Sequence, residues 1–170
     1  MVFPRQKVVV HVGEIGQSGE WGENGQLDWW LLDHGPYHVG VQRWVADLNA
    51  LYQQEPALWR GDYDSDGFWW VDCSDHAHSV LSFIRHDRES GHQVLVVLNL
   101  TPNPLLNYRV GLSLPGIWRE LLNSDASDYG GSNQGNAGGV TAEDYGVQSQ
   151  RYSALFTLPP LSVIVFRREG

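Results

Sequence analysis

Hydrophobic and polar positions follow two different patterns along the chain. Residues 7–12 form a short β-branched run that ends at Gly13, which predicts a buried strand. The segment from Gly13 to Gly35 is rich in Gly, acidic residues and Trp without a sustained period, which is typical of a long ordered loop. Apolar residues then recur at helical spacing, which predicts a helix over residues 41–54 that ends before Pro56. They are Val41, Trp44, Val45, Leu48 and Tyr52.

From Gly61 onward, short apolar runs alternate with turn clusters. The run from Val94 to Leu98 is continuously apolar, as expected of a central strand that is buried on both faces. Short strands separated by such turns are typical of an antiparallel β-sandwich of about 100 residues. The predicted strands are residues 68–71, 80–85, 93–100, 108–112, 116–122, 154–158 and 162–167.

The two patterns predict two units, a strand–loop–helix piece over residues 1–58 and a β-sandwich over residues 59–170. One strand and one helix leave strand edges unpaired and bury little surface, so the first piece cannot be a domain alone. We interpret it as the last βα unit of a larger barrel. The chain is therefore expected to begin partway through a domain.

The charge and the aromatic content of the chain indicate which classes of ligand it could bind. The formal net charge of −9, with scattered basic residues, argues against nucleic acid, because phosphate binding depends on clustered Lys and Arg. The chain contains eight Trp and seven Tyr, and aromatic rings bury large areas in cores but also stack on sugar rings. This aromatic excess keeps carbohydrate among the candidate ligands.

The single cysteine and the acidic residues limit the metal sites that the chain could form. Cys73 is the only cysteine, so neither an intrachain disulfide nor a Cys-rich zinc site can form. Residues 62–67 read D-x-D-x-D-G, the start of a calcium loop, but Cys73 stands where the loop needs a bidentate Glu. An acidic turn is expected instead, with no metal and no other cofactor.

The apolar run near the N-terminus is too short for a signal sequence or a membrane span, which predicts a cytoplasmic protein without a membrane partner.

A series of short motifs extends along nearly the whole chain. They are Gly13-Glu14-Ile15-Gly16-Gln17, Glu20-Trp21, Leu27-Asp28-Trp29, Gly40-Val41-Gln42-Arg43, Asp47-Leu48-Asn49, Gly67-Phe68-Trp69-Trp70, Asn99-Leu100-Thr101-Pro102, the run from Pro115 to Asp125, Tyr129-Gly130-Gly131-Ser132-Asn133 and Leu158-Pro159-Pro160-Leu161. In this order and spacing they resemble the C-terminal end of bacterial glycogen (1,4-α-glucan) branching enzymes, members of the α-amylase superfamily. Two features depart from that family: Val12-Gly13 replaces its usual pair of small residues, and Met1 stands where hundreds of residues should precede.

The resemblance implies a fold and an activity. It makes residues 7–12 the eighth strand of a truncated (β/α)8 barrel, residues 41–54 its eighth helix, and the rest the family's C-terminal β-domain. Such enzymes cut an α-1,4-glucan, hold it covalently on a carboxylate and transfer it to a 6-hydroxyl. In the family the catalytic carboxylates lie on strands four, five and seven, all of which would precede Met1. The chain alone is therefore expected to be inactive, with α-glucan and the missing upstream barrel as its partners.

Two groups of residues are candidates for contact with glucan. Glu14 would lie at the active-site rim, just past the end of a barrel strand, although a buried acid bonded to loop backbone explains it as well. Trp21, Trp29 and Trp30 form either a sugar platform at the mouth of the cleft or packing against the barrel.

Trp69 and Trp70 are neighbours on a predicted strand, so their side chains should point to opposite faces. One of them is expected outside the sandwich core, as a surface glucan site or as packing against the barrel. These two residues are the best candidates for substrate binding within the β-domain.

Two functions remain open at this point. The chain is either part of a glycosyltransferase whose β-domain braces the barrel, or a stand-alone carbohydrate-binding or interaction module. A stand-alone module has no use for a lone strand and an amphipathic helix, which favours the first. We also expect the helix face through Trp44 and Leu48 to be partly exposed or recruited into a dimer, since its barrel partner is missing.

Overall fold

The continuously apolar run after Gln93 forms the centre of the fold. It is strand β3 (Gln93–Asn99), which lies between β2 (Val80–His86) and β8 (Ser162–Arg168) in a large antiparallel sheet. The prediction of a central strand is therefore confirmed. The computed structural model describes residues 13–19 and 25–170, so the strand expected at residues 7–12 lies outside the described part.

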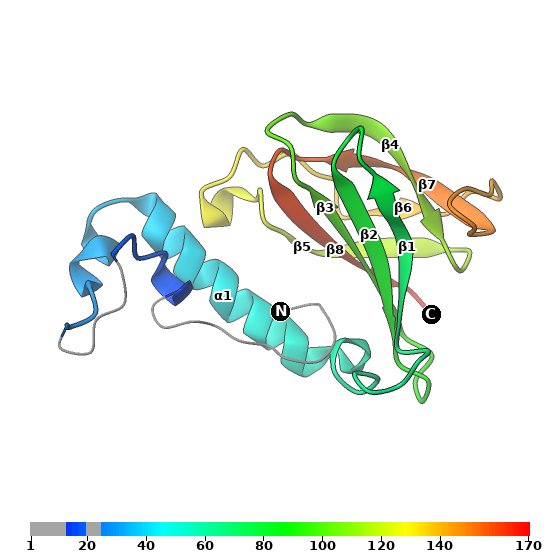
Figure 1. The fold of residues 1–170 in the computed structure, drawn as a ribbon, viewed down its shortest axis with the longest axis horizontal. Coiled ribbons are helices and arrows are strands. Elements are labelled where there is room, and N and C mark those ends of the chain that lie inside the picture. The colour runs from blue at the N-terminus through cyan, green and yellow to red at the C-terminus, as the bar shows by residue number, and fades with distance from the viewer. Residues whose placement is uncertain (1–12, 20–24) are drawn as a thin grey trace.

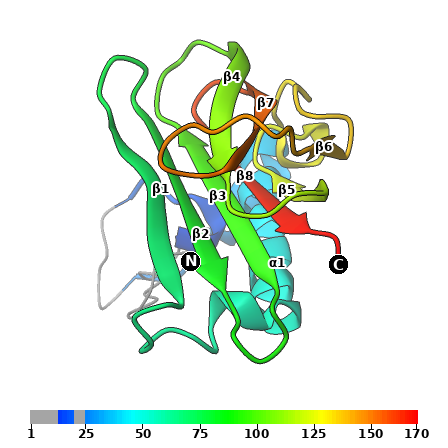
Figure 2. The same cartoon turned by 90° about the vertical axis from the view of Figure 1, so that its right-hand side faces the viewer.

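Two sheets form a sandwich (Figures 1 and 2). The larger sheet has the order β1-β2-β3-β8-β5-β6, the smaller one pairs β4 with β7, and neighbouring strands are antiparallel throughout. The remaining strands are β1 (Phe68–Asp75), β4 (Leu105–Leu112), β5 (Ile117–Asn123), β6 (Gly139–Thr141) and β7 (Tyr152–Leu158). The predicted antiparallel β-sandwich is confirmed.

The strands differ from the prediction at β6 and at the ends of several others; β4 begins at Leu105 and β7 at Tyr152, before their predicted starts at residues 108 and 154. β6 was not predicted, because a strand of three residues that begins with Gly139 shows no readable alternation. It pairs with β5 at the edge of the larger sheet. β1 continues to Asp75, past the predicted end at residue 71, because polar residues of the hairpin keep pairing with β2.

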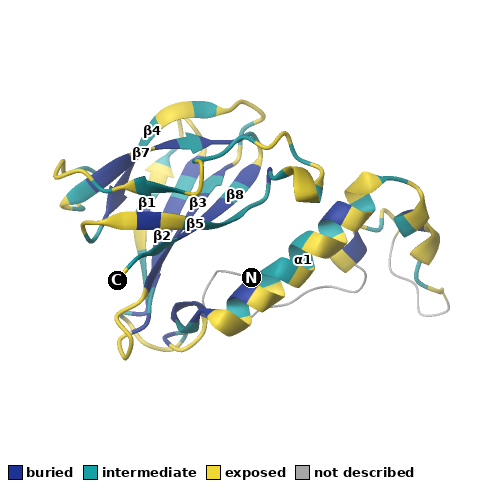
Figure 3. Ribbon diagram, turned by 180° about the vertical axis from the view of Figure 1, so that it is seen from behind, coloured by how far each residue is buried: buried dark blue, intermediate teal, exposed yellow. Residues whose placement is uncertain are grey.

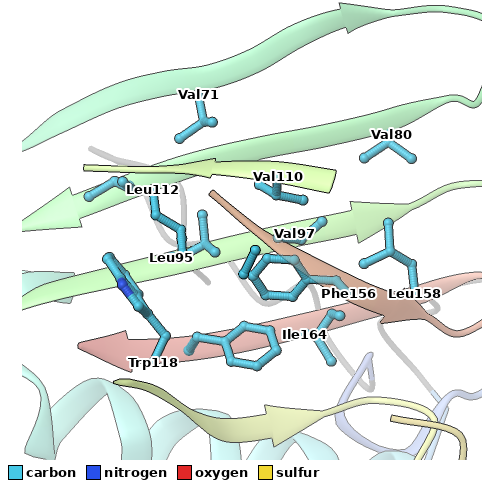
Figure 4. Packing of buried hydrophobic residues seen from close by; sticks show 13 residues of the cluster. Val71, Val80, Leu95, Val97, Val110, Leu112, Trp118, Phe156, Leu158 and Ile164 are labelled. Carbon is cyan, nitrogen blue, oxygen red and sulfur yellow. The ribbon is translucent and has the colours of Figure 1, made fainter. Parts of the chain in front are cut away.

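The main core lies between the two sheets and takes residues from both (Figure 4). Trp118 is fully buried there, and its indole Nε1 donates a hydrogen bond to the Leu114 carbonyl at 3.2 Å. The rings of Phe156 and Phe166 meet edge to face at 5.0 Å. The core residues are Val71, Val80, Ile84, Leu95, Val97, Val110, Leu112, Trp118, Ala154, Phe156, Leu158, Ile164 and Phe166.

A second buried cluster covers the outer face of the larger sheet. Helix α1 (Pro36–Gln54) contributes Leu51, and the short helix η3 (Pro56–Leu58) contributes Ala57 and Leu58. They pack on residues of β2, β3 and β8, namely Phe83, Val94, Val96 and Val165. Both faces of β3 are therefore covered, which is why its apolar run is continuous. Figure 3 shows that buried residues of α1 are few and that intermediate and exposed residues make up most of the helix.

Helix α1 begins five residues earlier than its apolar pattern, at Pro36, because proline suits the first turn of a helix. Its end at Gln54 is as predicted. Trp44 and Leu48 are half-buried, and the Trp44 ring meets the Tyr129 ring at 5.1 Å; the expected dimer through this face stays a prediction. Within the described residues, no helix combines the length and hydropathy that a membrane span requires.

Candidate functional site

Strand β1 places its two tryptophans on opposite faces, as predicted. β1 is an edge strand of the larger sheet, with Trp69 opposite Ile84 and Trp70 opposite Phe83 on β2. Trp69 is half-buried and packs against the core between the sheets. Trp70 points to the outer face and is 41% exposed. The strand alternation therefore places Trp70, and not Trp69, outside the core between the sheets.

The Trp70 ring is held by aromatic neighbours. It meets Phe68 edge to face at 5.2 Å and Phe83 edge to face at 5.7 Å, and these two phenylalanine rings lie 5.3 Å apart. Phe83 is fully buried, so the cluster is anchored in the fold. An exposed indole on a rigid base presents a flat surface without a large loss of conformational entropy on binding. We call Phe68, Trp70 and Phe83 the β1 aromatic cluster.

The other predicted site residues lie elsewhere. Glu14 is in the short helix η1 (Gly13–Ile15), and Trp29 and Trp30 begin η2 (Trp29–Asp33). Both short helices contact α1, away from β1 (Figures 1 and 3). The structure therefore does not bring these residues together with Trp69 and Trp70.

These N-terminal side chains are open to solvent. Trp29 and Trp30 are 56% and 54% exposed, and the Trp30 carbonyl oxygen lies 2.8 Å from the His34 Nδ1 atom. Glu14 is exposed, so its interpretation as a buried acid is wrong. Trp21 lies outside the described residues, and its predicted role is untested.

The acidic turn before β1 is organised by arginine. Asp62 accepts a hydrogen bond from the fully buried Arg85 at 2.5 Å, and Asp66 pairs with Arg88 at 3.0 Å. Among residues 13–19 and 25–170, no three His, Cys, Asp or Glu side chains are grouped to hold a metal ion. The carboxylates of this turn thus act as ion-pair partners that fix the entry into β1.

A polar network joins the β1–β2 hairpin to β4. The Tyr108 hydroxyl donates to an Asp75 oxygen at 2.5 Å, and His78 Nδ1 lies 2.9 Å from the same oxygen. Burial alone would raise the pKa of Asp75, but hydrogen bonds from Tyr108 and His78 outweigh it and hold that pKa below its ordinary value. Burial and the bond to Asp75 raise the pKa of Tyr108.

Sequence reasoning missed one cavity. It has a volume of about 540 Å³ and lies where α1 ends and the acidic turn begins. Its lining residues are Tyr52, Gln53, Trp59, Asp62 and Tyr63. These residues come from the end of a helix and from two turns, so no hydrophobic period in the sequence predicts that they lie together. Their high aromatic content was the one sequence feature that could have indicated a binding site.

Two curated relatives of this chain share one enzyme name. The chain is 49% identical over 166 residues to the 1,4-alpha-glucan branching enzyme GlgB of Synechococcus sp. (strain WH7803), which covers 98% of this chain and 22% of that protein. It is 46% identical over 164 residues to the enzyme of the same name from Synechocystis sp. (strain ATCC 27184 / PCC 6803 / Kazusa), covering 96% and 21%. The chain thus spans about a fifth of the length of these relatives.

Solved structures resemble the fold more distantly. The trehalulose synthase MutB from Pseudomonas mesoacidophila MX-45 matches with a TM-score of 0.48 and 20% identity, over 81% of this chain and 19% of that one. The alpha-amylase from H. orenii matches with a TM-score of 0.47 and 16% identity, over 76% and 20%.

The family assignment rests on the sandwich. The family model described as the alpha amylase C-terminal all-beta domain matches residues 70–169, which run from the start of β1 to the end of β8. This span is more than half of the chain, and it coincides with the two-sheet architecture found in the structure. The chain therefore belongs to the family of alpha amylase C-terminal all-beta domains.

Proposed function

We propose that this chain is the C-terminal portion of a 1,4-alpha-glucan branching enzyme, which transfers an α-1,4-glucan segment to a 6-hydroxyl. The observation that supports it most is the 46–49% identity to GlgB enzymes over nearly the whole chain. In this proposal residues 1–58 are the last strand–loop–helix unit of the catalytic (β/α)8 barrel, and α1 is its final helix.

The packing of α1 supports a bracing role for the sandwich. The end of the helix is buried on the larger sheet through Leu51, and the chain continues into η3, where Ala57 and Leu58 are fully covered. A stand-alone sandwich would not need a helix on this face. The β-domain would thus hold the last barrel helix in place and fix the rim of the active site.

The chain alone should lack branching activity, because the proposal places all three catalytic carboxylates upstream of Met1. Amylose incubated with the purified chain should keep its iodine absorption spectrum, whereas a full-length GlgB relative should shift it. Branch formation by the chain alone would contradict this part of the proposal.

The β-domain would also bind glucan through Trp70. Its indole is exposed on a rigid aromatic base, which suits stacking against the apolar face of a glucose ring. We expect the chain to be retarded in a native gel that contains glycogen, and Trp70→Ala to be retarded less than the wild type.

Two controls make this gel experiment decisive. Tyr145→Ala removes another exposed aromatic side chain, 59% exposed and in the loop between β6 and β7, and should leave the retardation unchanged. Circular dichroism checks that Trp70→Ala keeps its fold. Equal retardation of Trp70→Ala and the wild type would exclude Trp70 as the glucan surface.

A further inference from the structure

The cavity at the end of α1 is lined by aromatic rings from three separate segments. Tyr52 lies in the last turns of α1, Trp59 follows η3, and Tyr63 lies in the acidic turn. Tyr63 is 86% exposed and Trp59 is 38% exposed, so both rings are open to a ligand. The volume of about 540 Å³ falls in the range of small-molecule sites.

The Trp59 ring is held in place by a charged layer behind it. The Arg60 guanidinium lies 5.3 Å from the centre of the ring. Arg60 is itself fixed by the buried Asp87 at 3.0 Å and by Glu89 at 2.8 Å. A cation over one face of an indole restricts the ring and leaves its other surface for contacts. Trp59 is therefore a preorganised aromatic surface.

The charges at the cavity are balanced, which defines the ligand class. Asp62 is paired with the buried Arg85, and Arg60 is paired with two carboxylates. Among residues 13–19 and 25–170, the charged side chains at the cavity are thus held in ion pairs, which favours a neutral ligand. The polar groups that line the cavity are the Gln53 amide, the Asp62 carboxylate and two tyrosine hydroxyls. Aromatic faces combined with such donors and acceptors suit a neutral ligand that has both hydroxyl groups and C–H faces, which is a sugar.

The cavity and the β1 aromatic cluster lie on the same face of the larger sheet. Tyr52 packs against the outer buried cluster that contains Phe83, and Trp70 contacts Phe83 from the other direction along that face. Phe68 also packs on this outer cluster and meets Trp70 at 5.2 Å. The cavity and the β1 aromatic cluster thus each include a residue that packs on the outer buried cluster.

We propose that the cavity lined by Tyr52, Trp59 and Tyr63 binds glucose units of an α-1,4-glucan, as a second carbohydrate site besides Trp70. This inference rests on the proposed function, because the choice of α-glucan among neutral sugars comes from it. The cavity is formed by residues that precede and follow η3, so it exists only where α1 is docked on the sandwich.

The test follows the indole N–H signals of the whole 170-residue chain by NMR during titration with maltoheptaose. Trp59→Phe and Trp70→Phe identify the two signals that matter. We expect the Trp59 signal to shift in the wild type and equally in Trp70→Ala. Tyr63→Ala should weaken the affinity reported by Trp59 roughly tenfold, as expected for loss of one stacked ring. Because Tyr63 is 86% exposed, this variant keeps the fold, and Tyr145→Ala is its matched control.

The outcomes separate the two sites. A shift at Trp70 with none at Trp59 overturns the cavity proposal and leaves the Trp70 surface standing. A shift at Trp59 with none at Trp70 supports the cavity and overturns the Trp70 surface. Shifts at neither overturn both. An equal response of Trp59 to cellohexaose, which has β-1,4 linkages, overturns the assignment to α-glucan.

Discussion

Asp62 and Asp66 belong to the same acidic turn, but their carboxylates meet very different partners. Asp62 pairs with Arg85, whose side chain is completely buried and also donates from Nε to the Gly67 carbonyl at 3.2 Å. Asp66 pairs with Arg88, and both of these side chains are largely exposed. A buried arginine that loses a carboxylate partner loses charge compensation that buried surroundings cannot replace, whereas an exposed arginine is solvated by water.

Asp62→Asn should therefore lower the free energy of unfolding by about 3 kcal/mol. Asp66→Asn, the matched control from the same turn, should change it by less than about 1 kcal/mol. Urea denaturation followed by tryptophan fluorescence measures both values. A similar decrease in the free energy of unfolding for both variants would show that burial of Arg85 does not determine the size of that decrease.

Tyr108 links the pH dependence of stability to the contact between the sheets. Asp75 has a pKa below its ordinary value, so its contribution is present above the unfolded pKa of about 3.9 and disappears as the pH falls through the folded pKa. Tyr108 has a raised pKa, so its contribution is present below the unfolded pKa of about 10 and decreases at higher pH.

Tyr108→Phe should lower the free energy of unfolding by about 1.5 kcal/mol at pH 7, because it removes a hydrogen bond to an ionised carboxylate. This difference from the wild type should narrow as the pH falls below the unfolded Asp pKa of about 3.9 and through the lower folded pKa of Asp75, where its carboxylate becomes protonated. Urea denaturation at pH 7 and pH 3 measures it, and Tyr145→Phe, an exposed tyrosine, is the control. A loss that is the same at both pH values would contradict the role of the Asp75 charge.

At the scale of elements, α1 is docked through two contacts, one at each half. Its end is buried on the sheet, and its first half lies against η4 (Ser127–Tyr129). There the Tyr129 hydroxyl donates to Asp47 at 2.7 Å, and the rings of Trp44 and Tyr129 meet edge to face at 5.1 Å. A Cβ atom at Gly40 would lie 2.3 Å from the Tyr129 carbonyl oxygen, so the helix can approach η4 this closely only with glycine.

Gly40→Ala should reduce stability by roughly 1–3 kcal/mol, because the clash with backbone outweighs the gain in helix propensity. Thermal unfolding measures the change. Gly35→Ala is unsuited as a control because Gly35 has a φ of 138°, a backbone conformation that alanine rarely adopts, so the variant would be strained. Ala46→Gly, on the exposed side of α1, instead gives the propensity difference alone, about 1 kcal/mol. A stabilised Gly40→Ala variant would mean that α1 is not held against η4.

At the scale of the whole molecule, exposed large apolar residues follow one another closely at the start of the helical region. Val39, Tyr37, Trp29 and Trp30 are each at least 39% exposed and lie on η2 and the first turns of α1. Apolar residues that cluster in this way indicate a surface that meets another protein surface. In the proposed enzyme that partner is the upstream barrel.

The isolated chain should consequently self-associate through this surface. Light scattering coupled to size exclusion should give a mass that rises toward the dimer with concentration. Replacing Trp29 and Trp30 together by Ser should return the mass to 19.1 kDa, that of one chain. A monomer for the wild type at every concentration would contradict the predicted dimer.

The sequence by itself determined the elements and the family. Apolar periods gave α1 and all strands except β6, because those segments are long enough to show a helical or strand period. Strand alternation also gave the opposite directions of Trp69 and Trp70, since the period of two is a property of the strand itself. The motifs from Gly13 to Leu161 indicated the branching-enzyme resemblance without a structure.

Only the tertiary structure decided which side chains share a surface. The cavity joins Tyr52, Trp59 and Tyr63 because α1 docks on the sheet, and no local pattern records that approach. The exposure of Glu14 and its separation from β1 also became known only from the structure, because they depend on how η1 packs on α1. The role of Gly40 also depends on η4, which is distant in the sequence. Periodicity reports the environment of one element, whereas contacts between elements depend on the packing of the whole chain.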